Sequence, residues 1–355
     1  MNKTIIFALS SSVIAISALV ATSSQAATQS LTVYSGRSSG LVDPIVKQFK
    51  KDTGIDVKIR YATDAALFAT LEEEGARSPA DVYWVNTAGT LVNAAKKGLF
   101  AKLPAGILKR PAEFVPKSGL WTPLSARFRV VAYNPKTVNN TELPQTVLEM
   151  PKLTKFKGRI GWTPVYSSFQ DFVTALRSVY GEAKTKTWLL DMKKLEPKAY
   201  PSNTAMLDAM RAGEIDVALT NHYYIQKIIA GVREGEFEGV EEEKEKPTAP
   251  QPNLVGTHYF KAGDVGNLEL VTGAGILKTS KNAVVAAKFL EYLLSAKTQA
   301  LTTKTILEYP VVSGFTLPKT LLPLNEAIKR SPKIDFEKLV DIDNTLKLLR
   351  DVGLL

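Results

Sequence analysis

The sequence predicts an α/β protein of two lobes with a hinge and a ligand cleft between them. Two observations lead to this prediction. Strand and helix patterns alternate in two series along the 355 residues, and strand patterns near residues 130–134 and 268–277 lie where the chain leaves the first series and returns to it. Lobes joined in this way enclose a cleft that can close like a hinge.

The length of the chain also suggests two domains. We expect lobe 1 to contain residues 27–132 together with about 270–320, and lobe 2 to contain residues 133–269. The helices expected in residues 321–355 would pack on the lobes.

The first series alternates strand and helix three times. Its helices are bounded by turn residues such as Thr53-Gly54, and apolar residues recur in them at helical spacing. This alternation predicts a mostly parallel sheet with helices on both faces. The expected strands are Leu31–Ser35, Asp56–Tyr61 and Asp81–Val85, and the expected helices are Leu41–Thr53, Ala65–Glu74 and Ala88–Lys97.

The second series follows a strand at Phe128–Tyr133, which Arg127 precedes. An acidic and then proline-rich stretch, Glu241–Asn253, is expected to be an exposed loop. The further expected strands are Arg159–Thr163, Lys198–Tyr200, Ile215–Leu219 and Leu268–Leu277, and the further expected helices are Phe169–Tyr180, Lys184–Lys194, Asn203–Ala212, Ala283–Ser295, Lys297–Thr305 and the helical stretch Asn325–Leu348.

Residues 1–26 have the three parts of a secretory signal peptide. Lys3 supplies the positive charge, Ile5–Val20 is an apolar core, and Ser24 and Ala26 are small residues where a signal peptidase cuts. An uncleaved membrane anchor is the alternative, and the apolar core is short for it. We expect a mature protein that starts near Ala27 and is soluble in the periplasm.

The composition excludes several kinds of site. The chain has no cysteine and only two histidines, so thiolate sites are excluded, sites built mainly from imidazole are disfavoured, and a metal would have to be held by oxygen donors. There is no G-x-S-x-G motif, and we expect no enzyme. The net charge of +10 reflects either solubility or attraction of an anion or anionic chelate. No basic run interleaved with aromatic residues points to nucleic acid.

Two adjacent tyrosines, Tyr223 and Tyr224, follow the expected strand Ile215–Leu219. Asn221 is a good N-cap residue, and a helical pattern opens at Ile225. Adjacent side chains diverge in regular structure, so we expect an irregular strand-to-helix turn that lets both phenols reach one point. Such turns are where ligands bind in open α/β sheets. We interpret the pair as metal ligands, and packing in a cleft wall is the alternative.

Several strings, in this order and spacing, resemble the ferric-ion-binding proteins of bacterial ABC importers, which have the two-lobed periplasmic binding protein fold. The resemblance covers most of residues 30–320 and rests on the set rather than on any one string. The strings are Val33–Arg37, Glu74–Val82, Leu124–Val130, Gly158–Pro164, Gly213–Asp216, Asn221–Tyr224 and Glu308–Val311.

The resemblance implies that Tyr223 and Tyr224 are iron ligands and that Tyr166 is a third. In the family, lobe 1 often adds a histidine or tyrosine after the first strand and a carboxylate after the third. This chain has Arg37-Ser38-Ser39 and Val85-Asn86-Thr87 at those places. It therefore looks like the subgroup that relies on three tyrosines and a bound anion such as carbonate, with no strong ligand from lobe 1.

The chemistry agrees with this implication. Fe³⁺ is a hard cation, and a phenolate is a hard oxygen donor that forms when the metal displaces a proton. Three phenolates neutralise three charges and leave positions for carbonate or water. Arg127 could hold that anion with a bidentate fork, or it could be an exposed arginine at a strand start.

Further anion-binding candidates come with simpler alternatives. Arg37 is a second candidate arginine, or a solvated turn residue. Ser167, Ser168 and Asn203 could donate hydrogen bonds to the anion, or they could be helix caps. We expect His222 to be no ligand, and to serve in capping or at the surface.

The function expected from all of this is capture of ferric iron in the periplasm by a monomeric protein and its delivery to an inner-membrane ABC permease. Two alternatives stay open. One is a binding protein for a small organic or anionic solute, on which the tyrosines would stack. The other is a secreted enzyme that uses carboxylates, although no Ser–His–acid arrangement can be placed.

Overall fold

A computed structural model describes residues 29–231 and 254–355 of the chain. In these residues nine strands form a sheet with the order β2-β1-β3-β9-β4-β7-β5-β6, and β8 pairs with β4. The strands are β1 (Ser30–Ser35), β2 (Asp56–Tyr61), β3 (Val82–Val85), β4 (Thr122–Tyr133), β5 (Ile160–Trp162), β6 (Lys198–Ala199), β7 (Val217–Asn221), β8 (Gly256–His258) and β9 (Glu269–Ile276). The proposed signal peptide and the loop at 241–253 lie outside the described residues.

The expectation of a mostly parallel sheet is wrong at the centre of the molecule. β1 is parallel to β2 and β3, and β5 is parallel to β6 and β7. In contrast, β9 is antiparallel to both β3 and β4, and β4 is antiparallel to β7 and β8. β4 leads the chain into the second lobe and β9 brings it back, so these two strands have to run in opposite directions.

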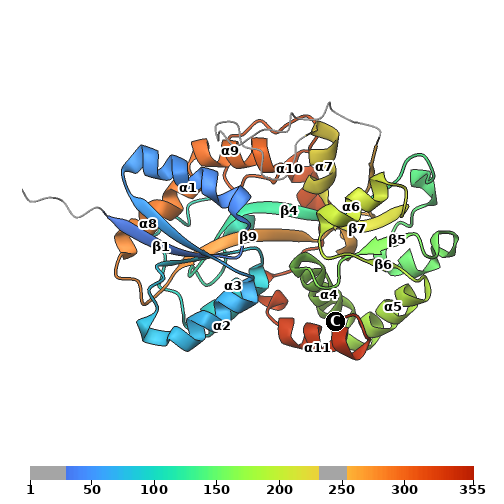
Figure 1. The fold of residues 1–355 in the computed structure, drawn as a ribbon, viewed down its shortest axis with the longest axis horizontal. Coiled ribbons are helices and arrows are strands. Elements are labelled where there is room, and N and C mark those ends of the chain that lie inside the picture. Colours follow the sequence, from blue (N-terminus) through green and yellow to red (C-terminus); the bar gives the residue numbers. More distant parts are fainter. Residues whose placement is uncertain (1–28, 232–253) are drawn as a thin grey trace, which may run out of the picture.

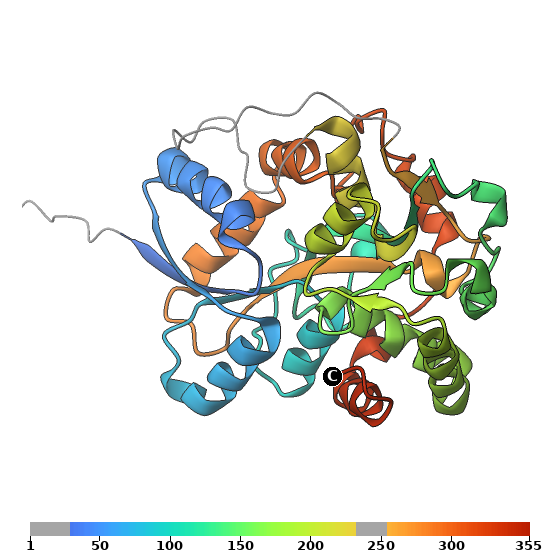
Figure 2. The ribbon, with the colours of Figure 1, turned by 45° about the vertical axis from the view of Figure 1, so that its right-hand side comes forward.

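Helices cover both faces of the sheet in each lobe, as expected. In the first lobe the apolar residues of α1 and α8 pack on one face and those of α2 and α3 on the other; in the second lobe α6 and α7 lie opposite α4 and α5 (Figures 1 and 2). The helices are α1 (Ser39–Thr53), α2 (Asp64–Glu74), α3 (Ala88–Lys96), α4 (Ser167–Tyr180), α5 (Glu182–Lys194), α6 (Asn203–Arg211), α7 (His222–Ala230), α8 (Ala283–Leu293), α9 (Ala296–Ile306), α10 (Leu324–Arg330) and α11 (Ile342–Asp351).

The strand alternation explains these layers. Leu31 and Val33 of β1 point into the apolar cluster under α1 and α8, whereas Tyr34 points into the cluster under α2 and α3. Both faces of β1 are therefore buried, as in parallel sheets covered by helices on each side.

The two lobes are connected through the middle of the sheet by β4 and β9, which lie side by side (Figure 1). β4 has 12 residues and begins at Thr122, six residues earlier than predicted from Phe128. Arg127 therefore lies in the middle of a buried strand and not at its start. A third segment runs along the same strand, since Ala126 forms an antiparallel bridge with Tyr309.

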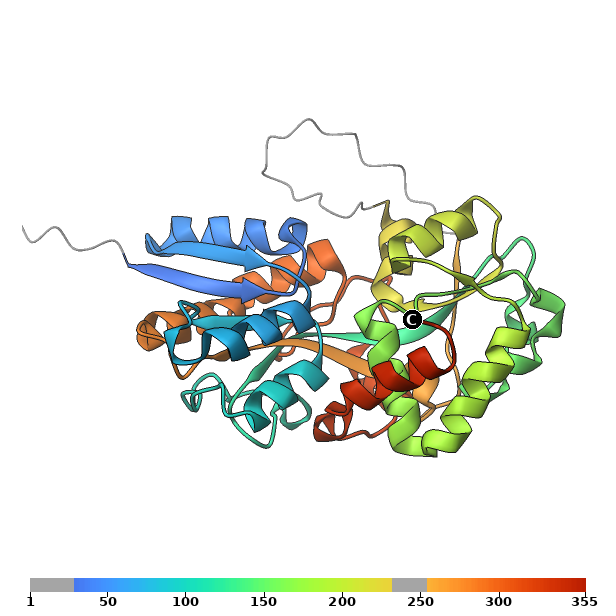
Figure 3. The same ribbon diagram turned by 60° about the horizontal axis from the view of Figure 1, so that its bottom comes forward.

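The C-terminal residues form a helical segment that is broken, where the sequence predicted one helical stretch over 325–348. α10 ends at Arg330, directly before Ser331-Pro332, because proline removes a backbone donor and clashes with the preceding turn. A 3₁₀ turn, η7 (Phe336–Leu339), contacts α3 and α4, and α11 packs along α4 (Figure 3). None of the helices in the described part of the chain combines the length and the apolar character needed to cross a bilayer.

Candidate metal centre

The tyrosine pair lies in the first turn of α7. β7 continues to Asn221, which is the N-cap, and the helix begins at His222 without an irregular linker. The expected irregular turn is therefore wrong. The two rings nevertheless lie together, with centroids 4.1 Å apart and planes inclined by 30°. Tyrosine side chains are long enough for their rotamers to bridge the divergence of adjacent helical positions.

Tyr166 joins the pair from a different element. It is the N-cap of α4, and its hydroxyl lies 3.1 Å from the hydroxyl of Tyr224. Burial raises the pKa of Tyr223 well above that of a free phenol, and the charges of Tyr166 and Glu308 add to this effect. The structure thus brings together Tyr166, Tyr223 and Tyr224, and burial favours the protonated form of Tyr223.

The phenols face a cleft of about 950 Å³ between the lobes. Tyr166, Ser167, Tyr223 and Tyr224 line it from the second lobe. The first lobe contributes a different set of lining residues, which includes Arg37, Tyr61, Asp64, Asn86 and Thr87. Two regions far apart in the sequence therefore face each other across a space of the size of small-molecule sites.

Two buried arginines of β4 lie behind the lining of this cleft: Arg127 bonds to Asn86, which lines it, and Arg129 bonds to Ser168, next to the lining residue Ser167. Arg127 donates from Nη2 to the carbonyl oxygen of Asn86 at 2.6 Å, and its positive charge acts to lower the pKa of Tyr223. Its Nη1 has no hydrogen-bond partner among residues 29–231 and 254–355. The alternative of an exposed arginine is wrong, since the side chain is 3% exposed.

Arg129 was missed as a candidate, although it lies two positions from Arg127 on the same face of the strand. It donates from Nη1 to Asn221 at 3.1 Å and to Ser168 at 3.4 Å, and its Nε and Nη2 find no partner in the described residues. Burial lowers its pKa to about 9, and the charge of Arg127 contributes. A buried guanidinium with unused donors is a natural site for an anion.

The proposed serines and Asn203 lie at the starts of two helices, but they are not the caps. The N-cap of α4 is Tyr166, and the N-cap of α6 is Ser202, whose hydroxyl accepts from a backbone N–H. The capping alternative is therefore wrong for all three. Ser167 lines the cleft, Ser168 accepts a hydrogen bond from Arg129, and Asn203 accepts one from Thr220 at 3.1 Å.

Two amide groups have unused donors at this end of the second lobe. The Nδ2 atoms of Asn203 and Asn221 are buried and unpartnered within the part of the chain that the structure describes. Asn221 was expected only as a cap, yet its side chain makes no capping hydrogen bond and accepts from Arg129 instead. These donors would suit the oxygen atoms of an anion.

Arg37 is buried, so the alternative of a solvated turn residue is wrong. It forms an ion pair with Glu308 at 3.3 Å, and Ser125 also donates to Glu308. Burial acts to lower the pKa of Arg37, and Glu308 more than offsets it, so the pKa lies above its ordinary value. The sequence could not reveal this pair, because 271 positions separate the two residues.

Asp64 and Asp171 are buried carboxyl groups of the cleft that sequence reasoning missed. Asp64, from the first lobe, packs on Gly36 and accepts from the backbone N–H of Asn86 at 3.1 Å. Asp171 lies on α4 of the second lobe, and its Oδ2 has no partner in the described ranges. Burial raises the pKa of Asp64 to about 6 and that of Asp171 to about 7, despite Arg127 nearby.

His222 is buried, so the expected surface role is wrong. The backbone N–H of Phe128 donates to Nδ1 at 3.1 Å, and Nε2 lies 3.0 Å from the carbonyl oxygen of Leu307. Nδ1 accepts, so Nε2 carries the proton and donates. Burial lowers the pKa of the imidazole to about 4, and the ring is neutral at physiological pH.

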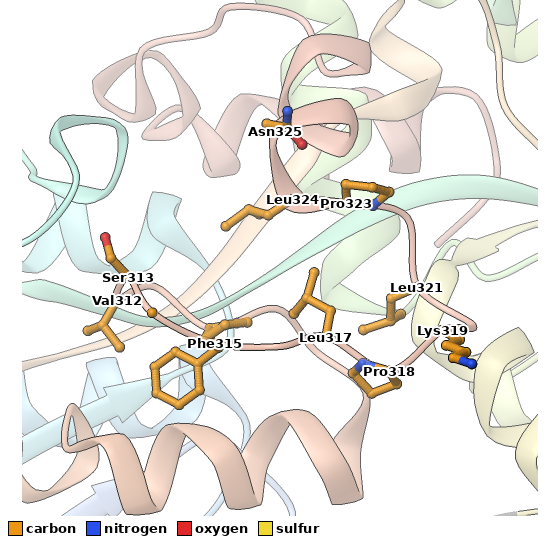
Figure 4. Close-up of a pocket in the computed structure, with 12 residues that line it drawn as sticks. Val312, Ser313, Phe315, Leu317, Pro318, Lys319, Leu321, Pro323, Leu324 and Asn325 are labelled. Carbon is orange, nitrogen blue, oxygen red and sulfur yellow. The ribbon is translucent and has the colours of Figure 1, made fainter.

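No group of three or more His, Cys, Asp or Glu side chains that could hold a metal ion occurs in the described ranges. A second hollow, of about 450 Å³, lies along the segment that follows Tyr309. Figure 4 shows mostly apolar side chains there, among them Val312, Phe315, Leu317 and Leu321. It contains none of the residues expected at the site.

A family model described as bacterial extracellular solute-binding protein matches residues 34–300. The chain belongs to this family. It is 32% identical over 346 residues to the Fe(3+)-binding periplasmic protein of Serratia marcescens, with 96% of each chain covered.

Solved structures of this family agree in fold. Iron-bound HitA from Pseudomonas aeruginosa superposes with a TM-score of 0.80 at 33% identity, over 92% of this chain and 100% of that one. A Trichodesmium protein, IdiA or FutA, in complex with iron and citrate ligands, superposes with a TM-score of 0.74 at 26% identity, over the same shares of each chain. The two-lobed periplasmic binding protein fold expected from the sequence is confirmed.

Proposed function

We propose that this protein binds ferric iron through the phenolate oxygens of Tyr166, Tyr223 and Tyr224. The observation that carries the proposal is the convergence of three phenols from α4 and α7 on the cleft, with 3.1 Å between two of the hydroxyls. Phenolates are hard donors, and three of them balance the charge of Fe³⁺. The names of the Serratia and Pseudomonas relatives support this choice of metal.

An anion such as carbonate would complete the coordination. The donors present fit such a group, since Arg127, Arg129, Asn203 and Asn221 all have buried N–H groups without a partner in the described residues. Ser167 and Ser168 lie at the start of α4, where backbone N–H groups point out of the helix. We assign the main anion contact to Arg127 and Arg129 together, and a weaker role to Arg37, which is already paired with Glu308.

The wider role that we propose is transport without catalysis. The protein would act as a periplasmic monomer after removal of residues 1–26, with lobe 1 formed by 27–132 and about 270–320 and lobe 2 by 133–269. Residues 321–355 pack on these lobes, and the closed form would deliver iron to an inner-membrane ABC permease. Membership of the solute-binding family supports this role.

The visible absorption spectrum tests the proposal directly. Addition of ferric citrate to the iron-free protein should produce the charge-transfer band of a ferric–tyrosinate complex, and metal analysis should give one iron for each chain. Ferrous iron should bind less tightly, because its lower charge displaces phenolic protons less readily. A colourless protein that contains no iron after this treatment would contradict the proposal.

A second candidate is a small anionic solute without iron. The buried and unpartnered donors of Arg127 and Arg129 beside a cleft of about 950 Å³ favour it. In that case the tyrosines would only stack on the solute. Calorimetric titration with carboxylates and phosphates, with and without Fe³⁺, separates the two candidates, since the iron proposal requires anion binding to depend on the metal.

A further inference from the structure

His222 precedes the proposed iron ligand Tyr223 and is the first residue of α7. Both of its ring nitrogens bond to the backbone of other elements: Nδ1 accepts from Phe128 of β4, and Nε2 donates to Leu307. Its ring also packs on Tyr309, with 5.0 Å between centroids. The side chain therefore fastens the start of α7 to two separate segments.

Both of these segments pass between the lobes. β4 is the strand that enters the second lobe, and Tyr309 of the other segment bridges to Ala126 of the same strand. Leu307 has a left-handed backbone conformation, with φ of 62°, which is unusual for leucine. A strained residue persists only where its surroundings hold it, and its carbonyl oxygen is held here by His222.

The segment after Leu307 continues to the first lobe. Glu308 forms the buried ion pair with Arg37, which lies in the loop after β1 and lines the cleft. The carbonyl group of Leu307 and the side chain of Glu308 thus connect adjacent positions of one segment to opposite lobes. The two anchor points therefore lie on consecutive residues of the chain.

We propose that His222 is a positioning residue. It fixes the proposed tyrosine ligands relative to β4 and the segment Leu307–Tyr309, which pass between the lobes, so that lobe closure and iron coordination occur together. This inference rests on the proposed function. If the imidazole is lost, Tyr223 and Tyr224 keep their oxygens, but the first turn of α7 can shift relative to β4. The expected consequences are altered iron–phenolate geometry and faster release of iron.

The test compares His222→Leu with His258→Leu. His258 is a matched control, because it is also buried, its nitrogens lie 2.8 Å from Asn140 Oδ1 and 2.9 Å from the Pro144 oxygen, and it lies on β8 outside the cleft. Three quantities are measured: the wavelength of the charge-transfer band, the rate of iron loss to a competing chelator, and the thermal stability of the iron-free protein. Removal of a group that orients a metal ligand typically costs about 10- to 100-fold in metal affinity.

His222→Leu should move the band and accelerate iron loss by about 10- to 100-fold. His258→Leu should lower stability without either effect. His222→Gln, whose amide can both accept and donate, should restore most of the wild-type behaviour. If His222→Leu does not fold, His222→Asn and His258→Asn give the same comparison, because the shorter amide cannot reach both partners.

The outcomes separate this inference from the proposed function. A wild-type protein without a ferric band contradicts the proposed function itself. A wild-type band that His222→Leu leaves unchanged, with iron loss equal to that of His258→Leu, overturns the role of His222 and leaves the tyrosine ligands in place. An equal shift in both histidine variants would likewise overturn it, since the effect would then follow from general loosening.

Discussion

The two walls of the cleft differ in how many of their polar groups are already bonded within the protein. On the first-lobe wall, Arg37 is paired with Glu308, and Asp64 accepts from the backbone of Asn86. On the second-lobe side, Asn203 and Asn221 retain donors without partners in the described residues, as do Arg127 and Arg129 of β4, the strand that connects the lobes. We therefore propose that the second lobe and the connecting strand β4 receive the ligand and that the first lobe mainly closes over it.

Replacing single tyrosines of the cleft gives the most direct test of the difference between the two walls. Tyr224→Phe keeps the ring and removes one proposed ligand from the second lobe, so iron affinity should fall at least about 100-fold and the charge-transfer band should weaken, a larger effect than that of an orienting residue. Tyr61→Phe is the matched control, since Tyr61 lines the same cleft from the first lobe. Equal losses in the two variants would show that the walls do not differ as we propose.

Replacing the arginines tests which of them bind the proposed anion. Arg129→Gln and Arg127→Gln should each weaken iron retention by about 10- to 100-fold, most strongly at low carbonate and low pH, because each removes a donor to the anion. At high carbonate, Arg37→Gln should reduce iron retention less than either of these two variants, since the Arg37 guanidinium is already bonded to Glu308. Iron competition assays over a range of carbonate concentrations measure this, and retention independent of Arg127 and Arg129 at every carbonate level would rule out the assignment.

The pH dependence of iron binding follows from the raised pKa of Tyr223. The phenol is protonated in the iron-free protein throughout the physiological range, so iron must release its proton. Each released proton makes the affinity rise about tenfold for each unit of increasing pH. Competition with citrate from about pH 8 to about pH 6 tests this, after correction for citrate's own protonation. Affinity that does not change with pH would mean that no phenolic proton is displaced.

A further effect is expected on the stability of the iron-free protein. The pKa of Asp171 is about 7 in the fold, above its value of about 4 in an unfolded chain. Its contribution to stability is therefore complete below about pH 4 and is lost as the pH rises to about 7. Asp171→Asn should flatten this part of the stability curve, as measured by denaturation at several pH values. If the stability curve of Asp171→Asn equals that of the wild type, burial does not raise the pKa of the Asp171 carboxyl group.

Local patterns in the sequence were enough for much of the fold. The bounds of β2 and the C-terminal ends of α1 and α4 lie where the sequence predicted them, because period and capping residues act over a few positions. Tyr223 and Tyr224 could be singled out for a related reason, since they are adjacent, whereas Tyr166 was expected only from the resemblance to ferric-ion-binding proteins. The antiparallel centre of the sheet could not be predicted, because it depends on where β9 inserts after the whole second lobe.

Burial of polar residues was the main failure of sequence reasoning. Arg37, Arg127 and His222 were each given an exposed or capping alternative, and all three are buried. A buried arginine and a surface arginine have the same local neighbours in sequence, and what covers them is decided by remote segments such as the one around Glu308. Arg129 and Asp64 escaped notice for the same reason.

The pairing of β4 with β9 and of Ala126 with Tyr309 has a mechanical consequence. Three segments bonded side by side form a ribbon that resists sliding and in-plane bending, because both would break backbone hydrogen bonds, whereas bending out of its plane would not. Closure of the lobes should therefore have essentially one degree of freedom, a single angle. One distance between two labels, one on α2 of the first lobe and one on α5 of the second, should then describe the whole closing motion.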